Sequence, residues 1–179
     1  MRLTCILEGR EKMLRELRES DAEFMLEWMH DVSVTQGLKA DFSKKTIDDC
    51  KEFINKSITQ TDLHYAIVNE NDEYLGTVSL KNMSDASAEF AITVRKVAMG
   101  KGVALDSMRQ IIDIGFDELG LDIIYWCVSP KNERAVRFYE KNGFQRDLDC
   151  KHLAKDDYSY EEIQEYIWYS VKRSNKERE

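Results

Sequence analysis

The run Gly100-Lys101-Gly102 lies where the sequence changes from a strand pattern to a helix pattern, and this position suits the binding of a phosphate group. Residues 88–94 are mostly β-branched, aromatic or small, and they contain no breaker, which is typical of a strand. Apolar residues then recur at helical spacing from Val103 to Leu119. The loop between them therefore directs free backbone N–H groups and the positive end of a helix dipole at one point. Such a point favours a phosphate or pyrophosphate.

The glycine spacing excludes two other phosphate loops. Neither G-x-G-x-x-G nor G-x-x-x-x-G-K-[ST] occurs, and G-K-G alone also fits an ordinary strand–turn–helix. A second pattern follows downstream. Residues 121–129 predict a strand, Asn132 is a natural N-cap for a helix over residues 133–141, and Gly143 ends that helix as its C′ residue.

With these motifs the chain resembles the GNAT acetyltransferase superfamily, and within it the branch of ribosomal-protein and polyamine N-acetyltransferases. The resemblance covers about residues 14–172. Val97 departs from the pattern, because the family usually has Arg or Gln three residues before the first glycine, so any side-chain contact made there in relatives is missing. The matching motifs are Ala88-Glu89-Phe90, Gly100-Lys101-Gly102 and Asn132-x-x-Ala135-x-x-x-Tyr139-x-Lys141-x-Gly143-Phe144.

The resemblance implies acetyl-CoA as the co-substrate. In the fold of this family, the strand before the glycine loop and the strand after the long helix splay apart, and the pantetheine arm bonds to the exposed strand edge as an added strand would. The backbones of Ile92 and Val94 would hold that arm, and Asn132 would touch the cofactor as well as cap its helix. The pyrophosphate would be held by the backbone amides of Met99, Gly100, Lys101, Gly102, Val103 and Ala104.

Two residues at the family's catalytic positions imply direct attack of an amine on the thioester. A primary amine with a pKa of about 10.4 is charged at pH 7, and presenting it neutral costs roughly 4–5 kcal/mol. Glu89 is the candidate general base, directly or through water; the alternatives are an exposed strand residue or a group that only binds a cationic substrate. Tyr139 is the candidate general acid for the CoA thiolate, because a phenol stays protonated at pH 7. A buried helix aromatic is the alternative for Tyr139.

The first two helices and the loop between them are expected to meet the acceptor, through Trp28, His30, Asp31 and Phe42. Residues 28–31 loosely resemble acetyltransferases that modify amino-sugar nucleotides or other small amines. A stacked surface tryptophan and a helix-terminal histidine explain this run equally well. Polyamines and protein N-termini therefore stay open as acceptors, and a homodimer stays open as the assembly.

Two other functions compete with acetyl transfer. A catalytically idle acyl-CoA-binding or scaffolding domain of the same fold is suggested by Val97 alone, and the presence of both Glu89 and Tyr139 argues against it. A Cys–His hydrolase would use Cys127 or Cys150 with His152 or His64, but the sequence has no nucleophile-turn motif.

Composition favours a single small cytoplasmic domain over residues 1–179. The chain is long enough to bury a core, and its 42% hydrophobic residues and one proline favour a compact globule. A net charge of −8 without a basic stripe disfavours nucleic acid, and Lys101 and Lys131 are the candidate local cations for an anionic cofactor. No apolar run has membrane-spanning length, and no signal-peptide pattern is present. The four cysteines lack C-x-x-C spacing, so we expect reduced thiols and no metal site.

These residues require a sheet with helices on both faces to position them. Capping-box patterns at residues 20–23 and 46–49 each begin a helix. The predicted fold class is α/β (α+β), a GNAT-like, mixed, largely antiparallel seven-stranded sheet. Strands are expected at residues 13–17, 63–69, 74–82, 86–95, 121–129, 144–153 and 165–172, and residues 2–7 favour a further strand before them.

Overall fold

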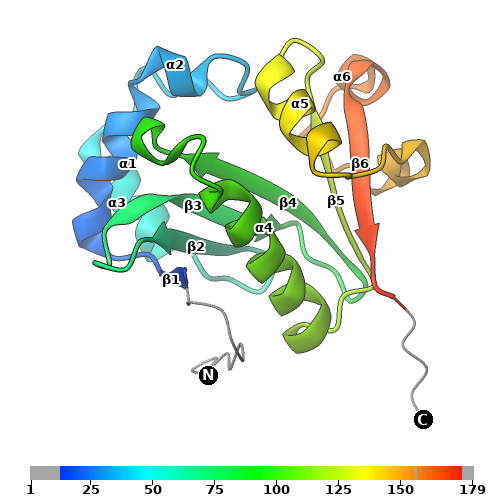
Figure 1. Ribbon diagram of the computed structural model, residues 1–179, viewed down its shortest axis with the longest axis horizontal. Coiled ribbons are helices and arrows are strands. Elements are labelled where there is room, and N and C mark those ends of the chain that lie inside the picture. Colours follow the sequence, from blue (N-terminus) through cyan, green and yellow to red (C-terminus); the bar gives the residue numbers. More distant parts are fainter. Residues whose placement is uncertain (1–12, 156, 175–179) are drawn as a thin grey trace.

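Six strands form one sheet in the described part of the chain, and they lie side by side in their order along the sequence (Figure 1). The computed structural model describes residues 13–155 and 157–174. Every neighbouring pair of strands is antiparallel except β4 and β5, which run parallel. The strands are β1 (Leu14–Glu16), β2 (Leu63–Val68), β3 (Tyr74–Lys81), β4 (Ser87–Val94), β5 (Ile123–Val128) and β6 (Ile167–Lys172).

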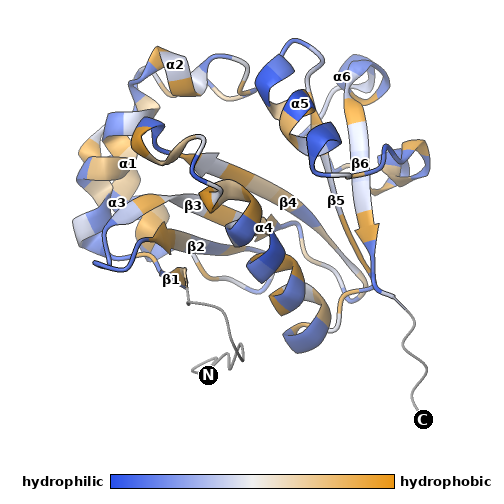
Figure 2. Ribbon diagram, viewed as in Figure 1, coloured by the Kyte–Doolittle hydropathy of each residue, from blue (hydrophilic) through white to orange (hydrophobic). Residues whose placement is uncertain are grey.

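Helices cover both faces of the sheet, and the alternation of side chains along β2 distinguishes the two faces. Ala66 and Val68 pack in one cluster with α1 and α3, whereas Tyr65 and Ile67 pack in another cluster with α4. Figure 2 shows hydrophilic residues along the outer side of α4 and hydrophobic residues where the elements meet. The helices are α1 (Ala22–Met29), α2 (Val32–Thr35), α3 (Ile47–Asn55), α4 (Val103–Asp113), α5 (Glu133–Lys141) and α6 (Tyr160–Glu165).

The strands β4 and β5 pair only where they begin. Residues 87–89 pair with residues 123–125. Beyond this point β4 continues beside β3, and β5 continues beside β6. Figure 1 shows the two strands diverging from their paired ends. The predicted separation of these strands is therefore confirmed, and the partly buried residues 91–94 lie along it.

Three predicted helix boundaries are confirmed by their capping contacts. Thr46 caps α3, and the Asp49 carboxylate accepts the Thr46 backbone N–H at 2.8 Å. Asn132 caps α5 by accepting the Ala135 backbone N–H at 3.2 Å. Gly143 follows α5 with a φ of 81°, a conformation that glycine adopts without strain. These contacts fix the start of α3 and both ends of α5.

The prediction that a capping box at Ser20 begins the first helix is wrong. A 3-10 turn occupies Glu19–Asp21, and α1 begins at Ala22. The reason lies in Asp21, whose carboxylate accepts the backbone N–H of Arg18 at 2.8 Å, so the capping box begins at Arg18, two residues before the predicted one. The loop after α1 also contains the short helix α2, which sequence patterns did not predict.

The predicted strand over residues 144–153 is also wrong, which reduces the predicted seven strands to six among the described residues. Only Arg146 forms a bridge, to Tyr169. The Asp147 carboxylate then accepts the Asp149 backbone N–H at 3.0 Å, and this turn starts a 3-10 helix over Leu148–Leu153. Helix α6 was missed, although Ser159 and Glu162 form a capping box at its start. The predicted strand at residues 2–7 lies outside the described residues.

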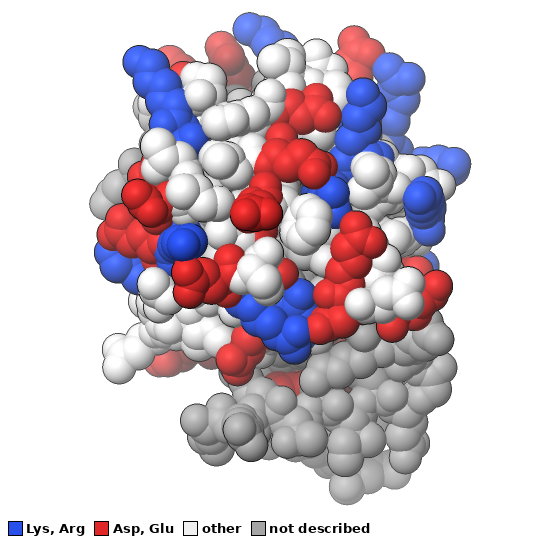
Figure 3. All heavy atoms as spheres, turned by 90° about the vertical axis from the view of Figure 1, so that its left-hand side faces the viewer, with Lys and Arg blue, Asp and Glu red and all other residues white. Residues whose placement is uncertain are grey.

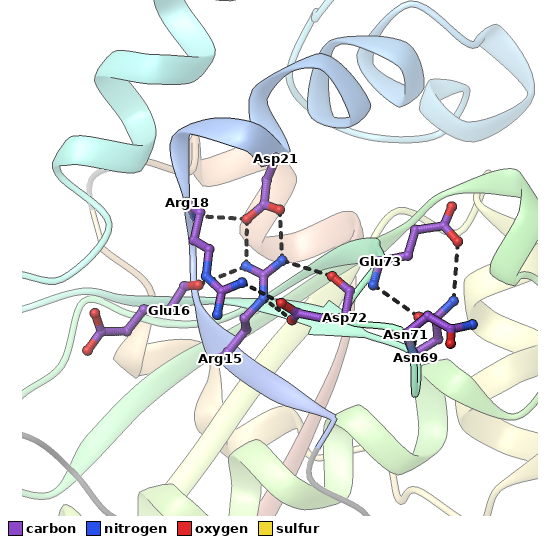
Figure 4. A network of polar contacts seen from close by, with 8 residues as sticks. All are labelled: Arg15, Glu16, Arg18, Asp21, Asn69, Asn71, Asp72 and Glu73. Atoms are coloured by element: carbon purple, nitrogen blue, oxygen red, sulfur yellow. Dashed lines mark hydrogen bonds and ion pairs between the residues drawn. The ribbon is translucent and has the colours of Figure 1, made fainter.

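An ion-pair network joins β1 to the turn between β2 and β3 (Figure 4). Asp21 is only 2% exposed, and its two carboxylate oxygens accept hydrogen bonds from the Arg15 guanidinium at 2.8 and 2.9 Å. The same guanidinium reaches Asp72, which also pairs with Arg18. Asp72 lies in the turn with a φ of 60°. The network therefore ties the first strand and the start of α1 to the β2–β3 hairpin.

Replacing Gly76 with alanine should lower the free energy of unfolding by about 1–3 kcal/mol, because the new methyl group cannot be accommodated. An added Cβ would lie 2.4 Å from the Thr93 carbonyl oxygen and 2.8 Å from the Val94 Cα, both of which are backbone atoms of β4. Urea unfolding measures the loss. Gly115→Ala is the control, because its Cβ would meet the tip of the Ile124 side chain, which can move. Equal losses in the two variants would contradict the explanation.

Candidate active site

A cleft of about 450 Å³ lies between the glycine loop, the separated end of β4 and helix α5. Most of the residues predicted to bind the cofactor line it, whereas Lys101 and Val103 do not. The catalytic candidate Tyr139 lines it as well. The predicted residues along its wall are Ile92, Val94, Met99, Gly100, Gly102, Ala104, Asn132 and Tyr139.

The glycine loop presents backbone N–H groups toward this region. Gly100 and Gly102 have φ angles of 75° and 81°, so both need the freedom of glycine. Gly102 is the N-cap of α4 and has no side chain to cap the helix. The Asp106 backbone N–H makes the first helical bond, to the Gly102 carbonyl oxygen at 3.2 Å. The amides of residues 103–105 thus lack acceptors within the helix, and with the helix dipole they form a receptor for an anion.

The cations that line the cleft are not Lys101 and Lys131, which were the candidates from the sequence. Arg134, Arg137 and Lys141, all on α5, line it. Lys131 lines a neighbouring hollow instead. Arg137 pairs with Glu133 at 2.7 Å on the exposed side of α5. The positive charge that an anionic ligand would meet therefore comes mainly from α5.

Arg95, which precedes the glycine loop, points away from the cleft. It is 5% exposed, and its guanidinium pairs with Glu27 of α1 at 2.9 Å and with Glu73 at 3.2 Å. It also lies over the ring of Phe24, 4.4 Å from its centroid. These contacts make Arg95 a clamp between α1 and the start of β3 rather than a ligand for a phosphate.

Tyr139 is a buried residue on the wall of the cleft. Its side chain is 7% exposed and packs against Trp126 and Tyr169, with ring centroids 5.3 and 5.1 Å away. Burial raises the pKa of its hydroxyl above the ordinary value of 10, so the phenol is protonated at neutral pH. A protonated phenol that lines a ligand cleft can act as a general acid.

A second cavity, of about 290 Å³, lies under α1 and α3 against the same stretch of β4. Two predicted acceptor residues, Trp28 and Phe42, line it, and their rings make an edge-to-face contact at 5.2 Å. The Trp28 indole N–H also donates to the Tyr74 hydroxyl at 3.1 Å. The cavity is lined by Met25, Trp28, Met29, Phe42, Lys45, Asp49, Phe53, His64, Thr77, Ser79, Ala91, Ile92 and Thr93.

Two other predicted acceptor residues do not line this cavity. The His30 ring lies outside it and contacts the Lys45 carbonyl oxygen through Nε2 at 2.9 Å. Asp31 caps α2, with its carboxylate accepting from the Ser33 backbone N–H at 2.8 Å. His30 instead lines a neighbouring cavity of about 410 Å³ together with Phe42, and the Asp31 carboxylate is engaged as the cap of α2. His64 was missed as a cavity residue, because its position on β2 carries no motif.

The cleft and the second cavity meet at β4. Ile92 and Thr93 line both of them. The cleft is walled by α4 and α5, and the second cavity by α1 and α3, which pack on the opposite face of the sheet. Because β4 has no partner on its β5 side along this stretch, groups bound on the two faces can approach each other at Ile92 and Thr93.

Glu89 lies on β4 three residues before Ile92, where β4 is still paired with β5, and it belongs to a closed polar cluster. It is 3% exposed and lines neither the cleft nor the second cavity. Lys81 approaches its Oε1 at 3.4 Å, and Asn82 donates to its Oε2 at 3.1 Å. The Tyr158 hydroxyl donates to Oε1 at 2.5 Å. The alternative of an exposed strand residue is therefore wrong, and Tyr158 is a partner of Glu89 that no sequence motif indicated.

Cys127 and Cys150, the thiols of the alternative hydrolase, do not form a nucleophilic site in the described structure. Burial raises the pKa of the Cys127 and Cys150 thiols to about 12, so neither is a thiolate at neutral pH. The His152 ring contacts the Asp149 carbonyl oxygen, and the His64 ring contacts Ser79. In the part of the chain that the structure describes, no cluster of three or more His, Cys, Asp or Glu could hold a metal ion, and no helix is long and apolar enough to cross a membrane.

A comparison with known protein families decides the identity of this arrangement. The acetyltransferase (GNAT) domain matches residues 13–145, which is most of the chain. The chain belongs to the GNAT acetyltransferase family. The glycine loop, the separated strands and the tyrosine on α5 are thus parts of a GNAT domain, and the predicted family is confirmed.

Individual GNAT proteins match over most of their length. Acetyltransferase PseH from Campylobacter jejuni is 23% identical over 145 residues, which cover 79% of this chain and 90% of the relative. A spermidine N(1)-acetyltransferase from Vibrio cholerae is 28% identical over 137 residues, covering 73% and 77%. The solved structure of spermidine N-acetyltransferase from Vibrio cholerae, in complex with CoA and spermine, superimposes with a TM-score of 0.72. It is 24% identical and covers 90% of this chain and 95% of that one, so it establishes the GNAT fold.

Proposed function

We propose that this GNAT acetyltransferase moves an acetyl group from acetyl-CoA to a primary amine of a small molecule by direct attack. The observation that carries this proposal is the meeting of two cavities at Ile92 and Thr93, where β4 lacks a partner on its β5 side. One cavity is suited to an anionic, extended donor. The other is small, largely apolar and on the opposite face of the sheet.

The chemistry of the cleft fits coenzyme A. The amides at the start of α4 and the cations of α5 would bind its pyrophosphate. The free edge of β4 at Ile92 and Val94 would bond the amides of its pantetheine arm, as an added strand does. Asn132 lies on the wall between these regions, although its side chain is already engaged with Ala135 and with the Gly37 carbonyl oxygen. When bound, acetyl-CoA supplies the thioester carbonyl that is attacked.

The proposed catalytic residues balance the protons of the reaction. Glu89 accepts the proton that the amine loses as its nitrogen bonds to the carbonyl carbon. Tyr139 donates its hydroxyl proton to the sulfur as the carbon–sulfur bond breaks, so the products are an amide and a free thiol. Glu89 is enclosed, and the amine's proton would reach it through an intervening group such as a water molecule.

The acceptor cavity favours a compact amine with a ring, such as an amino sugar. Trp28, Phe42 and Phe53 supply aromatic surface, and burial lowers the pKa of His64 below 6.5, so its imidazole is neutral at pH 7. The two charged residues on the wall, Lys45 and Asp49, carry opposite signs. The cavity therefore lacks the excess of acidic groups that would attract a polycation.

Spermidine is the second candidate acceptor, because similar proteins bear the name spermidine N(1)-acetyltransferase. Figure 3 shows many acidic side chains on the face formed by α1 and α3. Several of them already have cationic partners, such as Glu19 with Lys51 and Glu52 with Lys56. These pairs weaken the attraction of that face for a polyamine.

An amine screen with acetyl-CoA tests the proposed acceptor. We expect amino sugars and their nucleotide derivatives to give a higher kcat/KM than spermidine or N-terminal peptides, with released thiol as the readout. A preference for spermidine would favour the second candidate. Binding of acetyl-CoA without turnover of any amine would contradict the proposed transferase activity and favour a domain that only binds acyl-CoA.

Replacing Glu89 with glutamine should move the pH–rate profile toward higher pH. Without a base, turnover depends on the fraction of amine that is already neutral, and this fraction rises tenfold per pH unit below a pKa of about 10.4. The kcat/KM for the amine, measured from about pH 6 to about pH 10, reports the shift. Glu70→Gln, at an exposed position, is the matched control. An unaltered profile for Glu89→Gln would assign the base to another group.

A further inference from the structure

Tyr158 makes the shortest contact to Glu89 in the described structure. Its hydroxyl lies 2.5 Å from Oε1, whereas Asn82 and Lys81 lie 3.1 and 3.4 Å from the carboxylate oxygens. Tyr158 follows the 3-10 helix over Leu148–Leu153, and Glu89 lies on β4, so the contact joins parts of the chain that are distant in sequence. A short hydrogen bond from a neutral donor to a carboxylate is among the stronger polar contacts in proteins.

The ring of Tyr158 is held on several sides. It makes edge-to-face contacts with Trp168 at 5.8 Å and with Tyr166 at 6.2 Å. The Lys39 ammonium lies 4.3 Å from its centroid, and the same ammonium pairs with Glu162 of α6 at 2.8 Å. These contacts hold the ring, and its hydroxyl lies against both Glu89 and the thiol of Cys127.

Lys39 connects this cluster to the acceptor side of the molecule. It belongs to the loop between α2 and α3, in which Leu38 lines the cleft and Phe42 lines the acceptor cavity. Two contacts therefore link the loop to Glu89: Lys39 contacts the ring of Tyr158, and the hydroxyl of Tyr158 contacts the Glu89 carboxylate.

We infer that Tyr158 is a positioning residue for Glu89: its hydroxyl fixes the orientation of the carboxylate, and Lys39 fixes the ring of Tyr158 from the acceptor loop. This inference rests on the proposed function, in which Glu89 is the general base. Without the hydroxyl, Oε1 keeps only the longer contact with Lys81 and Oε2 keeps Asn82, so the orientation of the carboxylate is less constrained. A base displaced by about 1 Å loses about 10²-fold in rate.

Several charged and titratable groups surround Tyr158 and Glu89, and they come from different elements of the fold. Lys81 lies on β3, Tyr125 and Cys127 lie on β5, and Lys39 lies on the acceptor loop. Asp157 precedes Tyr158 and is bridged to Glu89 by Asn82. These neighbours also influence the pH–rate profile. The substitution at Tyr158 must therefore leave them in place, and a change that removes only the hydroxyl oxygen does so.

The test is Tyr158→Phe in the full chain, assayed with acetyl-CoA and the amine found in the screen. We expect kcat to fall by about 10- to 100-fold, the acidic limb of the pH–rate profile to move to higher pH, and the KM for acetyl-CoA to stay unchanged. Tyr160→Phe is the matched control, because Tyr160 is 74% exposed two residues away and should have wild-type kinetics.

A double variant separates this inference from the proposed function. If Tyr158 acts through Glu89, Tyr158→Phe should cause no further loss in a Glu89→Gln background. An equal loss in both backgrounds, or a Tyr158→Phe variant that behaves like Tyr160→Phe, would overturn the inference while leaving Glu89 as the base. A Glu89→Gln variant with unaltered kinetics would instead remove the proposed base itself.

Lys39 supplies a second measurement that does not alter Tyr158. We expect Lys39→Met to lower kcat by about threefold with the same direction of pH shift, because a half-exposed cation–π contact and ion pair are lost. Lys39→Arg should restore the rate, since a guanidinium can make both contacts. Equal kinetics for the methionine and arginine variants would contradict the role of Lys39. Near-UV circular dichroism shows whether Tyr158→Phe folds. If it does not fold, the same equal kinetics at Lys39 would overturn the inference.

Discussion

Replacing Tyr139 with phenylalanine should lower kcat by about 10²- to 10³-fold and leave the affinity for acetyl-CoA nearly unchanged. The ring packs against Trp126 and Tyr169, and phenylalanine preserves that packing. Only the hydroxyl that would protonate the departing thiolate is lost. Because burial raises the pKa of this hydroxyl above 10, the wild-type kcat should show no loss from its ionisation below about pH 10. Steady-state kinetics together with calorimetric titration of coenzyme A separate the two effects.

Tyr169→Phe is the control for this prediction. Tyr169 belongs to the same aromatic cluster, yet it does not line the cleft. The control should keep kcat within about twofold, since a change of less than about 0.5 kcal/mol in the activation free energy is expected away from the reacting atoms. A Tyr139→Phe variant with wild-type kcat would remove the catalytic role of Tyr139. Loss of coenzyme A binding in that variant would instead indicate that the hydroxyl holds the ligand.

Replacing Asp21 with alanine should lower the free energy of unfolding by about 3 kcal/mol, because it leaves a largely buried Arg15 guanidinium without its main partner. The Arg15 side chain is 13% exposed, and Asp21 supplies two of its hydrogen bonds (Figure 4). The backbone N–H of Arg18 loses its acceptor as well. Arg15 keeps its contact with Asp72, which limits the loss to the low end of the range for a broken buried pair. Urea unfolding measures the change, with the dependence of the unfolding free energy on urea concentration (the m-value) held equal for both proteins.

Asp72→Asn is the matched control in the same network. Its side chain is 50% exposed, and asparagine tolerates the left-handed backbone conformation at this turn. Exposed ion pairs contribute about 0–1 kcal/mol, so the control should lose at most about that amount. Losses of the same size in the two variants would show that burial of the Asp21 pair is not what makes it important.

The sequence allowed most of the framework of this fold to be predicted because its signals are local. Strands β2 to β5 and helices α3 to α5 are bounded by turns, caps and glycines that act on adjacent residues. Prediction failed between Phe144 and Ile167, where a backbone that could have formed a strand is instead turned by Asp147 and packed through Cys150 and Trp168. The turn at Asp147 is local and was overlooked, whereas the packing of Cys150 and Trp168 depends on tertiary neighbours, which a pattern of residue types does not contain.

In the candidate site, too, local motifs predicted some residues, whereas contacts between distant parts of the chain were not predicted. The motifs placed Tyr139 and most of the loop residues along the cleft, because the family fixes the spacing from loop to helix. They could not reveal that Glu89 is enclosed or that Tyr158 contacts it, since that contact spans β4 and a region without a motif. They also favoured Lys101 over the cations of α5, because closeness to the glycines in sequence does not determine the direction of a side chain.

The short pairing of β4 with β5 divides the described sheet into two parts, β1 to β4 and β5 to β6, whose strands are joined by three paired positions. Elements joined by few contacts open with lower free energies than the parts themselves, so amide hydrogens near the divide should exchange with solvent before those of β2 and β3. A ligand that bonds along β4 and also contacts α5 would act as a brace between the two parts. Coenzyme A should therefore slow exchange in both parts at once and raise the melting temperature with its concentration.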